Sequence, residues 1–247
     1  FLETDYLALN TKRPAFSDAS VRRAVNFALD RQAIATQIGV GAAAPTDQIL
    51  PPGIPGFRDA HIYPLGKPEL AKAKALMAGR QLTAKLFITT DPAAQNEAQV
   101  IKANLAAIGI DVSVKALTFS ALINVVGHTD AAYDMVLIGW AADYADPDDF
   151  INVTLAARNI TPSNNLNLPQ FDDPVFQKRM DADARLSGAA RSRAYAALDR
   201  DVMAQAAPWA PIANRVSREF VSSRVGCYVA QSVFPQLDLA AACLKGA

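Results

Sequence analysis

Residues 86–138 read LFITTDPAAQNEAQVIKANLAAIGIDVSVKALTFSALINVVGHTDAAYDMVLI, and their apolar residues recur with two different periods. Short apolar or alternating runs predict strands, whereas spacings of three and four residues predict the helices between them. In chain order, we predict strand 86–88, helix 94–108, strand 110–115, helix 119–126 and strand 135–138. This order is typical of right-handed parallel βαβ units. We therefore predict an α/β fold with a mixed, mainly parallel sheet flanked by helices.

Patterns on either side of this unit predict further elements. Residues 6–10 form a short apolar run that predicts a strand, and residues 45–64 hold five prolines, which predict a long irregular segment. We also predict helices within 18–38 and at 68–79, 173–186 and 189–205, followed by strand-like segments at 212–216 and 220–225. The run Pro208-Trp209-Ala210-Pro211 is expected to interrupt the regular structure before those last segments.

Composition excludes several classes of protein. The 247 residues carry a formal net charge of zero, so nothing indicates a nucleic-acid-binding protein, which would show a basic excess. The basic pairs Arg22-Arg23 and Arg191/Arg193 are interpreted as solvated helix faces. No apolar run approaches the roughly 18 residues that a membrane span requires, so we expect no direct membrane insertion. The chain starts Phe1-Leu2-Glu3-Thr4, and we expect a piece of a longer, exported protein whose signal peptide is absent from it.

The two cysteines, Cys227 and Cys243, allow two interpretations. They form a disulfide that closes a short C-terminal loop in an oxidising compartment, or they are two buried thiols. Their closeness in sequence and the absence of a competing cysteine favour the disulfide. Neither lies in a C-x-x-C motif, so metal binding and thiol redox chemistry are not expected.

Residues 139–150, GWAADYADPDDF, directly follow the predicted strand 135–138. Open α/β sheets bind ligands beyond the carboxyl ends of their parallel strands, so the position alone predicts a binding site. The segment holds Trp140, Tyr144 and four carboxylates, and a carboxylate beside an aromatic ring suits a cationic group such as an ammonium. Gly139 would let a ligand approach the backbone closely.

This acidic segment also allows other interpretations. Asp146 and Asp148 are expected to cap the next helix, with Pro147 at its first position, which leaves Asp143 and Trp140 as the better ligand candidates. A calcium loop would need regular spacing and a glycine that the segment lacks. No catalytic or phosphate-binding motif occurs, so we expect neither an enzyme nor a cofactor or metal. A hydrolase using the acidic loop would need a partner acid or base that the sequence does not show.

Three blocks of sequence resemble the family 5 extracellular solute-binding proteins of ABC importers, which bind oligopeptides, dipeptides or nickel. They are YLALNTKRPAFSDASVRRAVNFALDRQAI at 6–34, YDMVLIGWAADYADPDDF at 133–150 and AAPWAPIANRVSREFVSSRVGCY at 206–228. The resemblance is to the C-terminal half of that family. It implies the second lobe of a type II periplasmic-binding-protein fold at 1–211 and a C-terminal return segment at 212–247, with the first lobe missing.

The resemblance also implies a function. The aspartate of the family's GW-x-x-D pattern, Asp143 here, would pair with a peptide's ammonium, and the backbone at Trp140 and Ala141 would run beside the ligand. The expected partners are a short peptide or other small solute and the permease and ATPase subunits of an importer. The expected location is periplasmic or extracellular, and the resemblance allows a lipid anchor on the full-length protein.

The sequence leaves the solute and one alternative function open. Residues 163–174, SNNLNLPQFDDP, depart from the Gly/Asn/Tyr-rich stretch of many relatives, which leaves the identity of the solute undecided. The alternative function is a ligand- or protein-binding sensor or interaction domain with the same fold.

Overall fold

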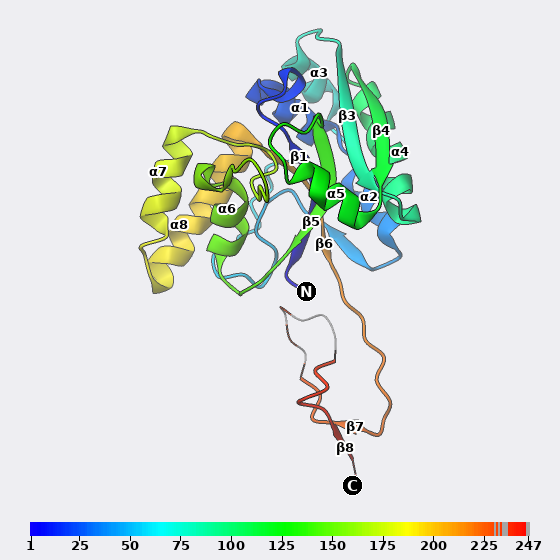
Figure 1. Ribbon diagram of the computed structural model, residues 1–247, viewed down its shortest axis with the longest axis vertical. Helices are drawn as coiled ribbons and strands as arrows, with labels where there is room; N and C mark the ends of the chain where they lie inside the picture. Colours follow the sequence, from blue (N-terminus) through cyan, green and yellow to red (C-terminus); the bar gives the residue numbers. More distant parts are fainter. Residues whose placement is uncertain (230, 232, 234–236, 246–247) are drawn as a thin grey trace.

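A six-stranded sheet forms the centre of the molecule in the computed structural model, which describes residues 1–229, 231, 233 and 237–245. The strand order is β2-β6-β1-β5-β3-β4. The strands are β1 (Glu3–Leu9), β2 (Ala43–Pro45), β3 (Leu82–Thr89), β4 (Ile110–Leu117), β5 (Met135–Ala141) and β6 (Trp209–Arg215). Figure 1 shows this sheet with helices around it. The five elements predicted between residues 86 and 138 are all present.

The sheet is mixed, as the sequence predicts. β3 pairs with β4 and with β5 in parallel, whereas β1 pairs antiparallel with β5 and β6, and β2 pairs antiparallel with β6. The prediction of a mainly parallel sheet is therefore wrong at the level of pairing, because only β5-β3-β4 form a parallel ladder. The buried strand β1 lies between β5 and β6 and runs against both.

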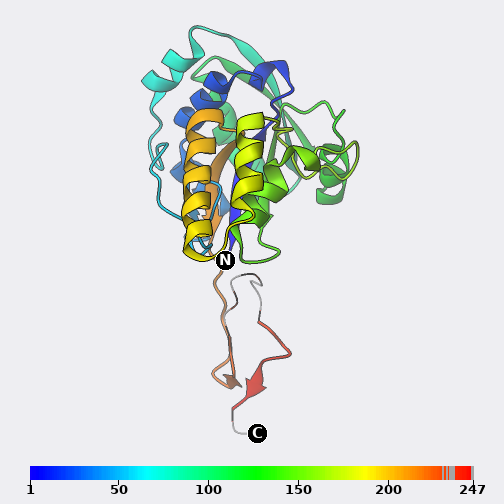
Figure 2. The same ribbon diagram turned by 90° about the vertical axis from the view of Figure 1, so that its left-hand side faces the viewer.

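Helices cover the sheet and extend the molecule to one side. They are α1 (Ala19–Ala28), α2 (Arg31–Ile38), α3 (Leu70–Met77), α4 (Pro92–Ala106), α5 (Phe119–Val126), α6 (Pro147–Leu155), α7 (Pro174–Asp183) and α8 (Gly188–Asp201). Short turns of other helix types lie at Pro14–Phe16, Ala157–Asn159 and Val202–Ala206. α1 packs on α3 and α2 on α4, while α6 and α7 pack on α8. Figure 1 places α6, α7 and α8 together beside the sheet, and Figure 2 shows α7 and α8 side by side.

Strand β6 corrects a prediction about the run 208–211. Regular structure was expected to break there, but β6 begins at Trp209 and contains Pro211. Pro211 lies opposite Tyr6, next to a register shift in the β1–β6 ladder, and a bulge is one of the few places where a strand accepts a proline. The rings of Tyr6 and Trp209 stack 3.4 Å apart in the centre of the core. This buried aromatic pair keeps the strand in the sheet despite Pro211.

Arg22 also departs from the sequence interpretation. Its side chain is buried rather than solvated, and its guanidinium donates to the backbone carbonyls of Ala206, Phe16 and Ser17 at 2.8, 2.6 and 3.0 Å. A charged group that is removed from water must have its donors satisfied, and these three carbonyls satisfy them. Arg22 therefore ties α1 to the helical turn Val202–Ala206, which precedes β6.

The irregular segment between β2 and α3 is held by buried polar side chains. Asp199 on α8 accepts from the backbone N–H groups of Ile49 and Leu50 at 3.0 and 3.2 Å and from Gln48 Nε2 at 3.2 Å. Asp47 accepts from the backbone N–H of Tyr63 at 2.8 Å. The segment therefore has a fixed path although it lacks a helix or strand of its own.

The C-terminal segment leaves the body after Val216, whose backbone N–H still donates to the Ala42 carbonyl at 2.8 Å (Figure 1). It contains a two-stranded ribbon of β7 (Val225–Gly226) and β8 (Cys243–Leu244). Of the strand predicted at 220–225, only Val225 lies in a strand. Cys227 and Cys243 form a disulfide with a Cα–Cα distance of 5.3 Å, which confirms that prediction. Among the described residues, no helix is long and apolar enough to cross a membrane.

Candidate functional site

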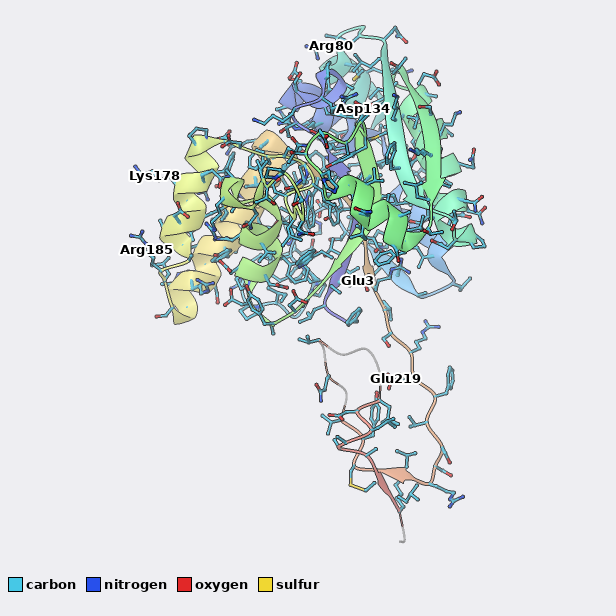
Figure 3. The ribbon with its side chains drawn as sticks, in the orientation of Figure 1. Glu3, Arg80, Asp134, Lys178, Arg185 and Glu219 are labelled. Atoms are coloured by element: carbon cyan, nitrogen blue, oxygen red, sulfur yellow. A yellow bond between two sulfur atoms is a disulfide. The ribbon has the colours of Figure 1, made fainter. Side chains whose placement is uncertain are left out.

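The predicted binding segment is divided between a strand and a loop. β5 does not end at Ile138 but continues to Ala141, so Gly139, Trp140 and Ala141 are strand residues opposite β1. The loop proper begins at Ala142, whose backbone N–H donates to the Leu2 carbonyl at 2.8 Å. The carboxyl ends of the parallel strands β3 and β5 lie at the edge of the body near Glu3, and Asp134 lies at the opposite edge (Figure 3).

The buried carboxylate of Asp149 holds this segment through two hydrogen bonds. Its Oδ2 accepts from Trp140 Nε1 at 3.3 Å and from the backbone N–H of Asp143 at 3.0 Å. Burial raises the pKa of Asp149, and its Oδ1 is buried without a hydrogen-bond partner among the residues that the structure describes. The ring of Trp140 and the backbone of Asp143 are thus positioned by a residue that the sequence interpretation did not single out.

The other two aspartates of the segment have different roles. Asp146 caps α6, as predicted, by accepting from the backbone N–H of Asp148 at 2.8 Å, and it also pairs with Arg191 at 2.6 Å. This ion pair holds the pKa of Asp146 below its usual value. Asp148 is not a cap, which corrects that part of the prediction. Its two oxygens accept from the hydroxyls of Tyr144 and Tyr195 at 3.1 and 3.2 Å.

Asp143 and Tyr144 are both exposed. The Asp143 carboxylate has no hydrogen-bond or ion-pair partner among the described residues, whereas Tyr144 donates its hydroxyl to Asp148. Asp143 therefore presents a free carboxylate two residues after β5, and its backbone and the ring of Trp140 are held by the same carboxylate of Asp149. A free carboxylate in this position is available to a cation from outside.

A cavity of about 970 Å³ opens next to this segment. Gly139, Trp140 and Ala141 line it, so the structure brings these three candidates together around one cavity. Asp143 and Tyr144 are outside its lining. The other walls come from β1, the ends of β3 and β6, the helices α4 and α5, and residues 164–168.

The cavity wall is acidic. Glu3, Asp5, Asp91 and Glu97 line it together with Arg215, which pairs with Asp5 through Nε and Oδ2 at 2.5 Å. Burial raises the pKa of Glu97 to about 8, and the nearby Asp5 adds to this. Burial likewise raises the pKa of Asp5 to about 7, although Arg215 opposes the shift.

Gly139 has a role at this wall that differs from the predicted one. A Cβ on Gly139 would lie 2.6 Å from Asp5 Oδ1 and 2.8 Å from Glu3 Oε1, closer than real Cβ contacts. Asp5 lies directly opposite Gly139 in the β1–β5 ladder. The missing side chain of Gly139 therefore makes room for two carboxylates of the protein itself.

The sequence held a signal for the acidic wall that the interpretation missed. Glu3 and Asp5 are two residues apart on a strand, which places them on one face. Glu97 stands three residues after Ala94 and four before Ile101, on the buried stripe of α4. A charged residue inside an apolar helical stripe marks a buried ionisable group. Asp149 offered a weaker signal, three residues after the cap Asp146, where a side chain points back toward the helix start.

No group of three or more His, Cys, Asp or Glu side chains in the described part of the chain is arranged to hold a metal ion.

The comparisons with known proteins agree with the fold. The model of the bacterial extracellular solute-binding proteins, family 5 Middle, matches residues 2–162, more than half of the chain. The chain belongs to this family. The family is one of transport proteins that bind solutes, and the mixed sheet with its flanking helices is the type II periplasmic-binding-protein fold.

Individual members of family 5 show how far the likeness extends. The probable di/tripeptide-binding protein 5 of Pseudomonas aeruginosa is 31% identical over 220 residues, which is 85% of this chain and 40% of that protein. Heme-binding protein A of Haemophilus influenzae is 28% identical over 241 residues, 94% of this chain and 43% of that protein. The chain thus spans about two fifths of the length of these curated relatives.

A solved structure matches over nearly the same length. The periplasmic binding protein DppA of Helicobacter pylori, in complex with the peptide STSA, superposes with a TM-score of 0.78 at 26% identity. The match covers 92% of this chain and 44% of that one.

Proposed function

We propose that this chain is the second lobe of the solute-binding component of an ABC-type importer and that it binds short peptides or a similar amine-bearing solute. The observation that carries the proposal is the free carboxylate of Asp143, held beside Trp140 by the buried carboxylate of Asp149. The names of two relatives, a di/tripeptide-binding protein and a protein bound to the peptide STSA, support a peptide as the solute.

The proposed binding mode follows from the two parts of the segment. An ammonium would pair with Asp143, and the solute would lie along Gly139, Trp140 and Ala141, which line the cavity. The ring of Trp140 would pack against the solute, with Tyr144 at the outer side of the loop. Main-chain recognition of this kind leaves the side chains of a peptide to the cavity, which suits a broad range of peptides.

The role of the whole protein is also part of the proposal. A first lobe would cover the cavity, and the permease and ATPase subunits of an importer would receive the solute. Residues 1–211 would form the second lobe and 212–247 the return toward the first, although β6 continues in the sheet to Arg215. The family's extracellular character and the disulfide support an export compartment, periplasmic or extracellular.

The test is peptide binding by the full-length protein and by its Asp143→Ala variant, measured by isothermal titration calorimetry. Loss of one partner of an enclosed charge pair should weaken binding by about 2–5 kcal/mol. Asp181→Ala is the matched control, because Asp181 is an exposed aspartate on α7 outside the cavity lining. Unchanged peptide affinity in Asp143→Ala would remove Asp143 from the site. If the protein binds hemin and no peptide, the proposed solute is wrong. Heme, the ligand that the name of one relative gives, would then take the place of the peptide.

A further inference from the structure

The wall of the cavity carries more negative than positive side chains. Four carboxylates, those of Glu3, Asp5, Asp91 and Glu97, line it, and Arg215 is the lining residue that faces them with a permanent positive charge. Arg215 is already engaged with Asp5. Asp91 caps α4 and accepts from the backbone N–H of Ala94. Glu3 and Glu97 are therefore the lining carboxylates without an ion-pair partner among the described residues.

Glu97 is the most informative of these residues. Only 4% of it is exposed, yet its carboxylate has no hydrogen-bond or ion-pair partner among the described residues. It lies on α4 between the buried residues Ala94 and Ile101 and lines the cavity. Its oxygens are not among the enclosed polar atoms that lack a partner, so they are open to the cavity. A donor that enters the cavity can therefore reach this carboxylate directly.

The pKa values of the wall carboxyl groups agree with a missing positive partner. Burial, together with the nearby Asp5, raises the pKa of Glu97 to about 8, and burial raises the pKa of Glu3 as well. These carboxyl groups are hard to ionise in the empty cavity because too little positive charge stands near them. A cation that enters the cavity would supply that charge and lower their pKa values.

We propose that this cavity binds a positively charged side chain of the solute, of the lysine or arginine type, and that Glu97 and Glu3 are its charged partners. This inference rests on the proposed function, since it names the class of solute, but it does not depend on the role of Asp143. Asp143 is outside the cavity lining, so the ammonium and the basic side chain would occupy different places.

The shape and the lining of the cavity suit such a side chain. Its volume of about 970 Å³ is at the upper end for small-molecule sites, so an extended side chain fits. The exposed apolar side chains of Phe119, Ile123 and Leu166 line it as well. A lysine or arginine side chain packs its aliphatic stem on apolar surface and directs its charge to polar groups.

The test compares matched peptides on the full-length protein by isothermal titration calorimetry. Tri-alanine carrying lysine at position one, two or three is compared with the same peptides carrying norleucine, which has a neutral side chain of similar length. At least one lysine peptide should bind about tenfold tighter than its norleucine match. In Glu97→Gln, this peptide should lose about thirtyfold in affinity, the lower end for removal of one partner of a buried charge pair. The norleucine peptide should be affected far less.

The pH dependence gives a second measurement. The ionisable groups around Glu97 are Glu3 and Asp5 on β1, Asp91 before α4, Arg215 on β6 and His128 after α5. Because Glu97 has a pKa of about 8 in the empty cavity, the lysine peptide should gain affinity relative to its norleucine match as the pH rises from 6 to 8.5, with release of protons. Both peptides carry the same α-ammonium, whose own titration cancels in this ratio. In Glu97→Gln, most of this pH dependence should disappear.

The outcomes separate this inference from the proposed function. Asp181→Asn, which removes the same charge outside the cavity, should bind every peptide as the wild type does. If lysine and norleucine peptides bind equally and Glu97→Gln changes neither, the inference is wrong while peptide binding stands. If no peptide of either kind binds, the inference and the proposed function both fail.

Discussion

Asp199 and Glu97 are two buried carboxylates that the protein treats in opposite ways. Both are almost fully buried, and burial raises their pKa values to about 7 and about 8. Asp199 accepts three hydrogen bonds from the segment 48–50, whereas Glu97 accepts none from the described residues. Burial alone therefore does not distinguish a structural carboxylate from one that is available to a ligand. The donors around it make the distinction.

The largest loss of stability is expected from Asp199→Asn. The amide group of asparagine would direct its own N–H groups toward backbone and side-chain donors at 48–50, which leaves buried donors without acceptors. We expect a loss of about 3 kcal/mol in the free energy of unfolding, measured by urea denaturation at pH 7. Asp181→Asn, on an exposed ion pair, should change stability by less than about 0.5 kcal/mol. Equal stability of the two variants would contradict the structural role of Asp199.

A smaller effect is expected from Gly139→Ala, which crowds the cavity carboxylates. The new Cβ would displace Asp5 and Glu3, and Asp5 is held by Arg215. Overpacking of this kind should cost about 2 kcal/mol in urea denaturation. Gly66→Ala is the control, because nothing lies within 4 Å of a Cβ there. If both glycines tolerate alanine equally, the two carboxylates do not lie against Gly139.

An effect of opposite sign is expected from Glu97→Gln. The pKa of Glu97 is raised from 4.5 to about 8 in the folded protein, so its ionisation opposes folding increasingly between these two pH values and fully above 8. The glutamine variant should therefore be more stable than the wild type at pH 8.5, by about 4 kcal/mol on the scale of about 1.4 kcal/mol per pKa unit, and equally stable near pH 4.5. Urea denaturation at both pH values provides the measurement. Destabilisation at pH 8.5 would show that Glu97 resembles Asp199 and is held by the protein itself.

The sequence predicts the elements whose stability is local. The strands and helices from 86 to 138 have clear periods, and the structure contains each of them. The sequence does not predict β2, which is the short run Ala43–Pro45, or the first part of β6, Trp209–Pro211, although it predicts a strand-like segment from residue 212. These strands exist because β1 and β6 supply pairing partners from elsewhere in the chain, and a local pattern does not contain that information.

The candidate site was predictable to a similar extent. Its position at the carboxyl end of β5 follows from the general rule for parallel strands, and that rule leads to Gly139, Trp140 and Asp143. The roles of Asp149 and Glu97 depend on which donors surround a buried carboxylate. That property arises only when α4, α6 and β1 are assembled, so sequence spacing indicates burial but not the absence of a partner.

The β1–β6 ladder also has a consequence for the order in which the body folds. Asn214 donates from Nδ2 to the hydroxyl of Thr4, a contact between residues 210 positions apart. The entropy lost on closing a loop increases with its length, so this contact is among the most costly to form early. The β5-β3-β4 ladder needs only residues 82–141 and can form while the rest of the chain is being synthesised. The central strand β1 gains its second neighbour only when β6 has left the ribosome.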